Sequence, residues 1–377
     1  MKKKALIIFD EFWPIAGAPS IRADNIIRAL ADWDVEVLGG NYSSQNSPEI
    51  KGHFIRRPDD MCPLRLGIFF LKMYSRLIYL TFTRKYDLLL ISIPKYELLY
   101  PLLILSPFIK CFHLDIRDSL GFLNYKKYFA HFLSELFAGI LDKLFKFVVE
   151  GSFNFALRKA QRVTCANAGI ADLLVKDQSK VVVVSNGVDV ELFSPAQKSS
   201  RSGKLQIAYL GNFVEKDRFD YLLAALPVCK RPVVLHLIGE GRNKSNILTQ
   251  LNQAKINYID HGKVMHAQIP GILAKCQLGV IFREEHTKES IPVCIYEFCA
   301  MGLPVLCNPV GTMKDFVLSN NLGAIISSSE QLIKTLNEDF IDDQFLNNFA
   351  HLPELARQKF SLAASRENFH KVFAEEG

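Results

Sequence analysis

This sequence of 377 residues lacks several features that would place it outside the globular cytosolic proteins. It has no low-complexity block and no short internal repeat, which excludes disordered, collagen-like and solenoid chains. Its eight cysteines form no C-x-x-C pair and have no histidine at zinc-ligand spacing, so we expect reduced thiols and no zinc site. The opening MKKKALIIF is too short an apolar run for a signal peptide, and we expect a protein that is not exported.

The positive charge is concentrated in one part of the chain. Residues 51–150 hold 15 Lys and Arg against 9 Asp and Glu, a surplus equal to the net charge of +6 of the whole chain. The same stretch is crowded with Leu, Phe, Ile and Tyr, which favours an anionic membrane surface over a nucleic-acid groove. We therefore expect a membrane partner and no nucleic acid.

Apolar runs of strand length alternate with helical patterns along the chain, which predicts parallel, doubly wound sheets. The first series starts at residues 5–9, and a second begins after the polar segment 195–204, whose composition suits an exposed linker. Because the chain is too long for one ordinary core, we predict two Rossmann-like domains of class α/β, at 1–195 and 204–354. We expect the amphipathic tail, about 355–377, to be a helix able to pack back on the first domain.

Several apolar stretches bear on the membrane interpretation. Residues 98–109 are broken by Pro101 and Pro107 and are too short to cross a bilayer, so we expect a buried helix there. Residues 62–85 are apolar almost all round, with four cations on roughly one side of a helix: Arg65, Lys72, Arg76 and Arg84. Such a stripe suits an anionic headgroup layer, and it suits equally a core helix with snorkelling cations. An aromatic and basic stretch at 124–147 favours membrane contact.

The segment KESIPVCIYEFCAMGLPVL, residues 288–306, carries clear signals for a helix. Ser290 can cap its start, Pro292 suits its first turn, and Gly302 is a natural C-terminal stop. We therefore predict a helix that starts near Ser290 and ends before Gly302.

Two carboxylates flank the start of this predicted helix. Glu289 lies just before it and Glu297 about two turns inside it, roughly 10 to 12 Å away at about 1.5 Å per residue, comparable to the span of a nucleoside diphosphate. Between them, the free backbone N–H groups of Ser290, Ile291 and Val293 form a natural diphosphate site. The spacing alone is also compatible with two solvated carboxylates.

Six segments, taken in order, cover most of the chain: EFWPIAGAPSIRA, VVVVSNGVDVELFSP, IAYLGNF, HLIGEGRN, INYIDHGKV and the E-x7-E segment with AMGLPVL. Together they resemble the large family of retaining glycosyltransferases with an E-x7-E motif, glycosyltransferase family 4 or glycosyl transferases group 1. The resemblance implies a GT-B fold, in which two Rossmann-like, doubly wound parallel-sheet domains face a cleft. The N-terminal domain would bind the acceptor and the C-terminal domain the nucleotide-sugar.

The resemblance also implies roles for individual residues. Glu289 matches the residue that contacts the donor sugar, and we expect it to be catalytic, whereas Glu297 matches the residue that grips the ribose hydroxyls. Gly17 belongs to a loop similar to the family's glycine-rich loop, where a small residue lets the backbone approach the diphosphate. Glu240, at the end of a predicted strand, is expected to face the donor.

The cation that balances the leaving diphosphate departs from the family pattern. Many members carry Arg after the glycine that matches Gly211 and Lys a few residues later, but this chain has Asn212 and, at the expected Lys position, Asp217. We expect Lys216 and Arg218, which straddle Asp217, to act jointly on the diphosphate. Their alternative role is that of solvent-facing loop charges.

The candidates for the acceptor side all lie on or just after one predicted strand. The family often has a His-Asp pair at the end of a central strand, where this chain has Arg117 and Asp118. Open α/β sheets bind ligands at the carboxyl ends of their strands, so we select Asp118 as a catalytic candidate and Arg117 as an acceptor contact. His113 is a rival acceptor contact, although a lone His beside a strand is more often structural.

Together these features predict a retaining glycosyltransferase that moves a sugar from a nucleotide-sugar donor to a hydroxyl of a glycan or lipid-linked acceptor. We expect it to act in bacterial cell-surface polysaccharide synthesis, such as lipopolysaccharide or capsule, as a peripheral protein on the cytoplasmic face of the membrane. No metal or other cofactor is expected, because a helix N-terminus and cations would stabilise the diphosphate. Two alternatives remain, a GT-B nucleotide-sugar epimerase and a non-catalytic GT-B binding subunit.

Overall fold

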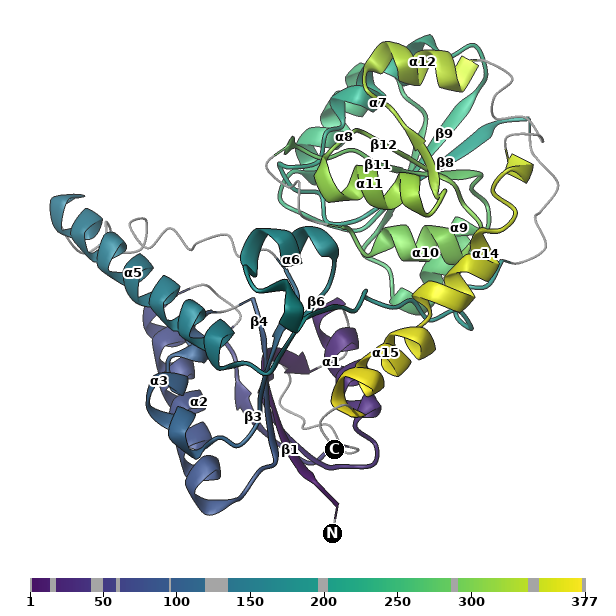
Figure 1. Cartoon of the computed structure of the whole chain (residues 1–377). Helices are drawn as coiled ribbons and strands as arrows, with labels where there is room; N and C mark the ends of the chain where they lie inside the picture. Colours follow the sequence, from purple (N-terminus) through teal and green to yellow (C-terminus); the bar gives the residue numbers. More distant parts are fainter. Residues whose placement is uncertain are drawn as a thin grey trace. The chain divides into compact units, whose positions relative to one another are not determined.

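The chain folds into two compact units (Figure 1). The first comprises Met1–Ser185 with Arg366–Gly377, and the second comprises Asn186–Ser365. Each unit contains one sheet of its own. The structure is a computed structural model that describes residues 2–13, 18–41, 50–58, 62–94, 96–118, 135–195, 203–285, 291–337 and 346–374.

The first unit is built on a seven-stranded sheet. Its strands are β1 (Lys4–Trp13), β2 (Asp34–Asn41), β3 (Gly52–Arg56), β4 (Leu88–Ile93), β5 (Phe112–Ile116), β6 (Arg162–Cys165) and β7 (Val181–Val183). All neighbouring strands pair in parallel, in the order β3-β2-β1-β4-β5-β6-β7. The order reverses between β1 and β4, as in doubly wound sheets.

Helices cover both faces of this sheet. They are α1 (Ala18–Ala29), α2 (Pro63–Thr83), α3 (Leu102–Leu105), α5 (Glu135–Lys159), α6 (Ala168–Leu174) and α15 (Leu362–Ala374). Successive strand residues point to opposite faces, so Leu6 and Ile8 of β1 pack in the core under α2, α3, α5 and α6. Ala5 and Ile7 pack in a second core, under α1 and α15. The sheet is thus buried on both faces, which explains its continuous apolar strands.

The outer faces of α2 and α5 carry large apolar side chains. Leu64, Leu71 and Phe82 of α2 are 73%, 66% and 58% exposed, and Phe137 and Phe147 of α5 are 61% and 75% exposed. Figure 1 shows α2, α3 and α5 on the same side of the first sheet. Within the described ranges, no helix is both long enough and apolar enough to cross a bilayer.

The apolar stretch at 98–109 is only partly the buried helix that the sequence predicts. Two prolines, Pro101 and Pro107, divide it into short helical pieces, because a proline cannot continue the hydrogen bonding of the turn before it. Leu102 and Leu105 are buried, whereas Ile104 is 71% exposed. This stretch therefore extends the apolar outer surface of α2 and α5.

The second unit is built on a six-stranded parallel sheet with the order β10-β9-β8-β11-β12-β13. Its strands are β8 (Leu205–Leu210), β9 (Val233–Ile238), β10 (Tyr258–Gly262), β11 (Leu278–Ile281), β12 (Val305–Cys307) and β13 (Gly323–Ile325). Its helices are α7 (Asp220–Ala225), α8 (Lys244–Gln253), α9 (Ile269–Leu273), α10 (Cys294–Ala300), α11 (Gly311–Ser319), α12 (Ser329–Asn337) and α14 (Leu352–Leu355). The predicted α/β class, with two doubly wound parallel sheets, is confirmed.

The second unit starts earlier than the polar linker that the sequence suggests. Val188 N–H donates to Phe360 O at 2.8 Å, and Leu362 N–H donates to Val188 O at 2.9 Å. Gly187 packs so closely against Leu362 that an added Cβ would lie 2.9 Å from its Cα. These contacts assign residues 186–195, which the sequence places in the first domain, to the second unit.

The end of the chain packs on the first unit from Arg366 onward. Phe369 and Phe373 of α15 are buried in the core under α1. Arg366 Nε donates to Asn25 Oδ1 of α1 at 3.1 Å. The apolar side of this helix thus completes one covering layer of the first sheet.

Candidate functional site

The strand order of the second unit marks a place where a ligand can bind. Open parallel sheets bind ligands beyond the carboxyl ends of their strands, where the strand order reverses, and here it reverses between β8 and β11. Arg218 N–H donates to Phe282 O and Glu284 N–H donates to Lys216 O, both at 3.0 Å. The segment after β8, with Lys216 and Arg218, is therefore fixed beside the end of β11.

Arg283, at this switch point, was not singled out from the sequence. Its Nη1 lies 2.9 Å from Asp217 Oδ1, and 16% of its side chain is exposed. Asp217 is held by Tyr209 O–H, which donates to Oδ2 at 2.7 Å, and by Val214 N–H at 3.1 Å. Asn308, after β12, bonds both the N–H and the C=O of Arg283. The sequence signal that could have pointed to Arg283 is Asp217, the acid at the family's Lys position. A buried carboxylate at that position needs a cation nearby.

The two predicted cations differ in their surroundings. Arg218 makes a bidentate contact with Asp220, at 2.7 Å from Nε to Oδ1 and 2.6 Å from Nη2 to Oδ2. This contact raises the pKa of Arg218 above its usual value. Lys216 is half-buried, and its backbone carbonyl is anchored next to β11. Lys216 and Arg283 therefore lie at the switch point, whereas the side chain of Arg218 is paired with Asp220.

The helix of the E-x7-E segment starts later than predicted. α10 begins at Cys294 with Val293 as its N-cap residue, and Ile295 N–H donates to Pro292 O at 3.1 Å in a tight first turn. The helix therefore begins after the start that the sequence predicts near Ser290, with Val293 in the N-cap position. Three predicted site residues, Gly17, Glu289 and Ser290, lie outside the described residues. Ile291 and Val293 are described and half-buried.

Glu297 is not a solvated carboxylate. Only 10% of its side chain is exposed, and His266 Nε2 lies 2.9 Å from its Oε1. His266 belongs to the short helix η5 (His266–Gln268), and its ring centroid lies 5.0 Å from that of Phe193. The hydrogen bond with Glu297 raises the pKa of His266 above its usual value. His266 was not predicted as a site residue because it lies 31 positions before Glu297 in the sequence.

Glu240 lies at the carboxyl end of β9, where two strands approach closely. Lys244 Nζ, on a side chain that is 7% exposed, donates to Glu240 Oε1 at 2.8 Å and lies 2.7 Å from Asp260 Oδ1. Gly239 has φ +128°, and an added Cβ would lie 2.0 Å from Gly211 O. Only glycine permits this approach of the ends of β8 and β9, next to the exposed Glu240.

In the first unit, Arg117 belongs to a charged cluster at the ends of three strands. Its Nη2 donates to Asp10 Oδ1 at 2.5 Å, and Arg57 Nη1 contacts both Asp10 Oδ2, at 3.3 Å, and Glu11 Oε2, at 2.9 Å. Arg117 Nη1 is buried without a hydrogen-bond partner in the part of the chain that the structure describes. Asp118 follows directly and is exposed. An oxygen atom of a ligand could accept the hydrogen bond that this buried N–H group at a strand end lacks.

His113 packs inside the first unit. Its side chain is buried in β5, and its ring centroid lies 5.6 Å from that of Phe373. Two residues further along the same face, Asp115 is fully buried. It accepts hydrogen bonds from three side chains of neighbouring elements: Arg22 at 2.7 Å, Ser92 at 2.6 Å and Thr164 at 2.6 Å.

Part of the second unit is similar to a family of known proteins. The family model described as Glycosyl transferases group 1 matches residues 204–339. We call residues 204–339 the group 1 domain after this match. Glycogen synthase of Mycobacterium tuberculosis is 22% identical over 171 residues, which are 43% of this chain and 40% of that enzyme. The similarity thus spans less than half the length of that relative.

Solved structures share the fold of nearly the whole chain. Sucrose-phosphate synthase from Thermosynechococcus elongatus superposes with a TM-score of 0.76 at 14% identity, over 99% of both chains. Anabaena Alr3699/HepE, solved in complex with UDP, superposes with a TM-score of 0.70 at 14% identity, over 99% of this chain and 100% of that one. The group 1 domain is therefore part of a GT-B fold.

Acidic residues outside the group 1 domain include one Asp-x-Asp pattern, Asp32 and Asp34. Asp34 opens β2 and its Oδ1 lies 3.0 Å from Lys51 Nζ, so this pattern lies at the amino end of the strand, away from the ligand-binding edge. In the described ranges, no three His, Cys, Asp or Glu side chains are grouped closely enough to hold a metal ion.

The group 1 domain thus offers two kinds of chemistry. Arg283 presents a fixed guanidinium at the switch point, and a guanidinium carries five N–H donors, more than one carboxylate oxygen can use. Glu297 presents a buried carboxylate whose orientation is set by His266. The first can stabilise the oxygens of an anion, and the second can accept hydrogen bonds from hydroxyls.

Proposed function

We propose that this chain is a retaining glycosyltransferase that moves a sugar from a nucleotide-sugar to a hydroxyl of a glycan or lipid-linked acceptor. The observation that carries the proposal is Arg283, held by Asp217 beside Lys216 at the switch point of a group 1 domain. Cations that are fixed before the reaction stabilise the charge that develops on a leaving diphosphate without a cost of reorganisation. The UDP bound by HepE supports a nucleotide-linked donor.

Other residues take roles that fit their surroundings. Glu297 accepts the ribose hydroxyls, because His266 holds its carboxylate in one orientation. Glu289 contacts the donor sugar, as the family resemblance implies. On the acceptor side, Arg117 Nη1 donates to an acceptor oxygen, and Asp118 stands next to it at the end of β5.

The charge of Arg283 provides the test of the donor site. Arg283→Gln should lower kcat/KM for sugar transfer at least about tenfold, which corresponds to roughly 1.4 kcal/mol of lost transition-state stabilisation. Lys275→Gln makes the same charge change at the other end of β11 and should leave the rate within about twofold. Equal rates in the Arg283→Gln variant and the wild type would reject the assignment.

The same assay separates the alternative functions. It is run with UDP-, GDP- and ADP-sugars, with and without an acceptor. Conversion of a UDP-N-acetylhexosamine without an acceptor would indicate an epimerase, and donor binding without turnover would indicate a binding subunit. We also propose that transfer needs no metal, so it should continue in EDTA. Loss of activity in EDTA, restored by Mg²⁺ or Mn²⁺, would contradict this.

The acceptor side is proposed to work at a membrane, on the cytoplasmic face, in bacterial cell-surface polysaccharide synthesis. Four exposed apolar residues of α5 recur every three or four positions and form one stripe: Phe137, Ile140, Leu144 and Phe147. This stripe and the outer side of α2 lie in the part of the sequence with the positive surplus. Apolar side chains combined with cations match an anionic bilayer surface.

Vesicle binding tests the membrane proposal. Phe137→Ser with Phe147→Ser should reduce sedimentation with anionic vesicles at least about tenfold, because about 0.8 kcal/mol is lost per inserted CH₂. Val228→Ser with Leu318→Ser removes two exposed apolar side chains from the second unit and serves as the matched control. Equal sedimentation of both double variants would refute the role of α5.

A further inference from the structure

A basic pocket of about 390 Å³ lies between β3 and the start of α2 in the first unit, and the proposed donor site uses none of its residues. Its size falls within the range of small-molecule sites, about 300–1,000 Å³. Among the described residues of its lining, every charged one is a cation. The lining consists of Arg56, Arg57, Arg65 and Lys72 with Pro58, Ile68 and Phe69.

Two elements bring these cations together. Arg56 ends β3 and Arg57 follows it, whereas Arg65 lies in the first turn of α2 and Lys72 two turns later. Arg57 is buried, with 9% of its side chain exposed, and its Nη1 is fixed by Asp10 and Glu11. The pocket therefore has a rigid charged wall from the sheet and a second charged wall from the helix.

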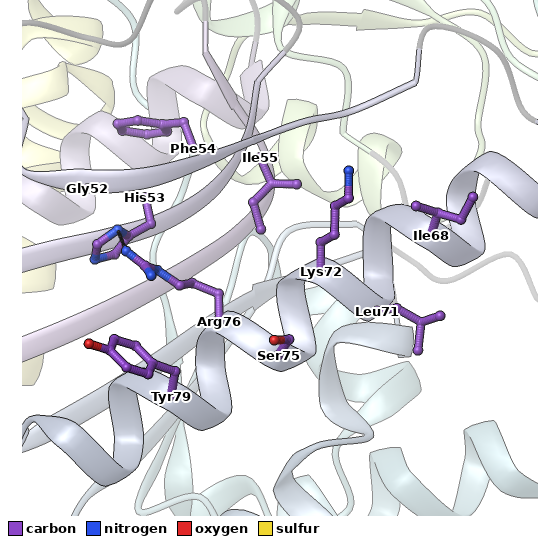
Figure 2. A pocket seen from close by; sticks show the side chains of 10 residues that line it. All are labelled: Gly52, His53, Phe54, Ile55, Ile68, Leu71, Lys72, Ser75, Arg76 and Tyr79. Carbon is purple, nitrogen blue, oxygen red and sulfur yellow. Dashed lines mark hydrogen bonds between the residues drawn. The ribbon is translucent and has the colours of Figure 1, made fainter.

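A neighbouring pocket of about 760 Å³ continues the basic surface along α2, and Ile68 and Lys72 line both pockets. Figure 2 shows Arg76 and His53 pointing toward one another across this second pocket. Arg76 Nη2 donates to His53 Nδ1 at 2.6 Å, and His53 Nε2 donates to Glu36 Oε1 at 2.7 Å. The buried Glu36 thereby fixes the orientation of Arg76, and the cations line one continuous groove.

We propose that the pocket at Arg56 and Lys72 binds a phosphate monoester group. Such a group carries about −1.5 to −2 charge and three acceptor oxygens, which suits several converging cations, whereas a neutral sugar hydroxyl needs none. The positive end of α2 adds to the field, since in the described part of the chain this 21-residue helix has no acidic residue in its first turn and no side-chain cap. The inference goes beyond the proposed function and names a phosphate-bearing molecule as a ligand of the first unit.

Binding of inorganic phosphate to the full chain, followed by calorimetry, tests the pocket. Arg56→Gln with Lys72→Gln should weaken binding at least about tenfold, because hydrogen bonds to a charged group are lost. Both residues are exposed, so the fold should tolerate the change. Asp59 and Asp60 follow Pro58 outside the described residues, and measuring on the full chain includes their effect.

Two control variants assign the binding to this pocket. Lys85→Gln with Lys176→Gln removes the same charge elsewhere on the first unit and should leave the affinity within about twofold. Arg283→Gln should also leave the phosphate affinity unchanged. Loss of phosphate binding in that variant would instead indicate phosphate bound at the donor site. If the pocket variant proves unstable, Lys72→Gln alone is used. Equal affinity of the pocket variant and the Lys85/Lys176 control would overturn the proposal.

A vesicle experiment identifies the source of the phosphate. Neutral vesicles are compared with vesicles that contain phosphatidic acid, whose headgroup is a phosphate monoester. Weaker binding of phosphatidic acid vesicles by the pocket variant than by the Lys85/Lys176 control supports a lipid ligand. Equal vesicle binding, with inorganic phosphate still lost in the pocket variant, supports a soluble phosphate ester. If neither probe distinguishes the pocket variant from the control, the proposal fails.

Discussion

The two units share one architecture but present different surfaces. Both sheets are parallel, and in both the strand order reverses once. Among the described residues, the first unit exposes 17 large hydrophobic side chains and the second exposes four. The second unit shows that this kind of sheet can be covered without a large apolar surface. The excess on α2, α3 and α5 is therefore not a requirement of this kind of fold.

The units also differ in where they bury charge. In the first, Arg22 and Asp115 pair between α1 and the sheet, with 2% and 0% of their side chains exposed. In the second, Asp217 and Glu297 lie beside partly exposed partners, at the edge where open parallel sheets bind ligands. The Arg22–Asp115 pair thus joins α1 to the sheet, whereas Asp217 and Glu297 belong to the candidate donor site.

The largest expected effect comes from breaking the buried pair of the first unit. Burial would raise the pKa of Asp115, but the charge of Arg22 and the hydrogen bonds that Asp115 accepts lower it below its usual value. Arg22→Met leaves this carboxylate buried without its cation and should cost about 3–5 kcal/mol of unfolding free energy. Arg28→Met, on the exposed side of the same helix, should cost less than about 1 kcal/mol.

Denaturant unfolding followed by tryptophan fluorescence measures this effect. Both tryptophans of the chain, Trp13 and Trp33, belong to the first unit, so their signal reports on that unit. Similar midpoints for the Arg22→Met and Arg28→Met variants would show that the buried pair does not stabilise the first unit.

Glu36 gives the first unit a stability that is lost in acid. Burial would raise the pKa of Glu36, but hydrogen bonds from Tyr86 and His53 and the charge of Arg84 lower it below 4.5. Because the folded-state pKa is depressed, this stability is present above about pH 4.5 and is lost as the pH falls through the folded value. Glu36→Gln should cost about 1.5–3 kcal/mol at pH 7.

Unfolding midpoints between pH 7 and pH 3 check this prediction. The difference between the wild type and the Glu36→Gln variant should shrink below pH 4.5. Glu150→Gln, an exposed change on α5, should follow the wild-type profile. A difference that stays constant with pH would mean that Glu36 does not titrate with folding.

The next prediction concerns the second unit and the hydrogen bond from Tyr209 to Asp217. Tyr209→Phe removes the hydrogen bond to Asp217 and should cost about 1 kcal/mol. Tyr258→Phe, which removes a contact to Asn252 on the exposed side, should cost less than about 0.5 kcal/mol. Hydrogen exchange with mass spectrometry should show faster exchange in the second unit alone. Faster exchange in both units would show that the two do not open independently.

The smallest effect concerns His266 and has the opposite pH dependence. The hydrogen bond with Glu297 raises the pKa of His266 above 6.5. The stabilisation is therefore present below about pH 6.5 and is lost as the pH rises through the folded value. In Glu297→Gln, the titration of the His266 ring, followed by NMR, should shift toward lower pH, whereas Glu330→Gln on α12 should not shift it. An unchanged titration in Glu297→Gln would mean that the contact is absent in solution.

Much of the fold was predictable because hydrophobic periodicity is a property of each segment alone. Strands such as Leu88–Ile93 and the alternation with helices lead directly to parallel sheets. The start of α10 was predicted too early because Ser290 and Pro292 are good signals for a helix start. In the structure a tight turn at Pro292 comes first, and the helix begins at Cys294. The unit boundary lies before the polar linker because the backbone at Val188 bonds with a distant segment of the chain.

The sequence by itself determined the α/β class, the family-like segments and the candidates at strand ends, because these depend on local pattern and residue type. Only the tertiary structure decided which charges meet. Arg22 lies 93 positions from Asp115, and Arg283 reaches Asp217 because the strand order places β11 beside β8. The basic pocket likewise exists because α2 packs beside β3. Such pairings follow from strand order and packing, which are encoded by the whole chain and not by the pattern of any one segment.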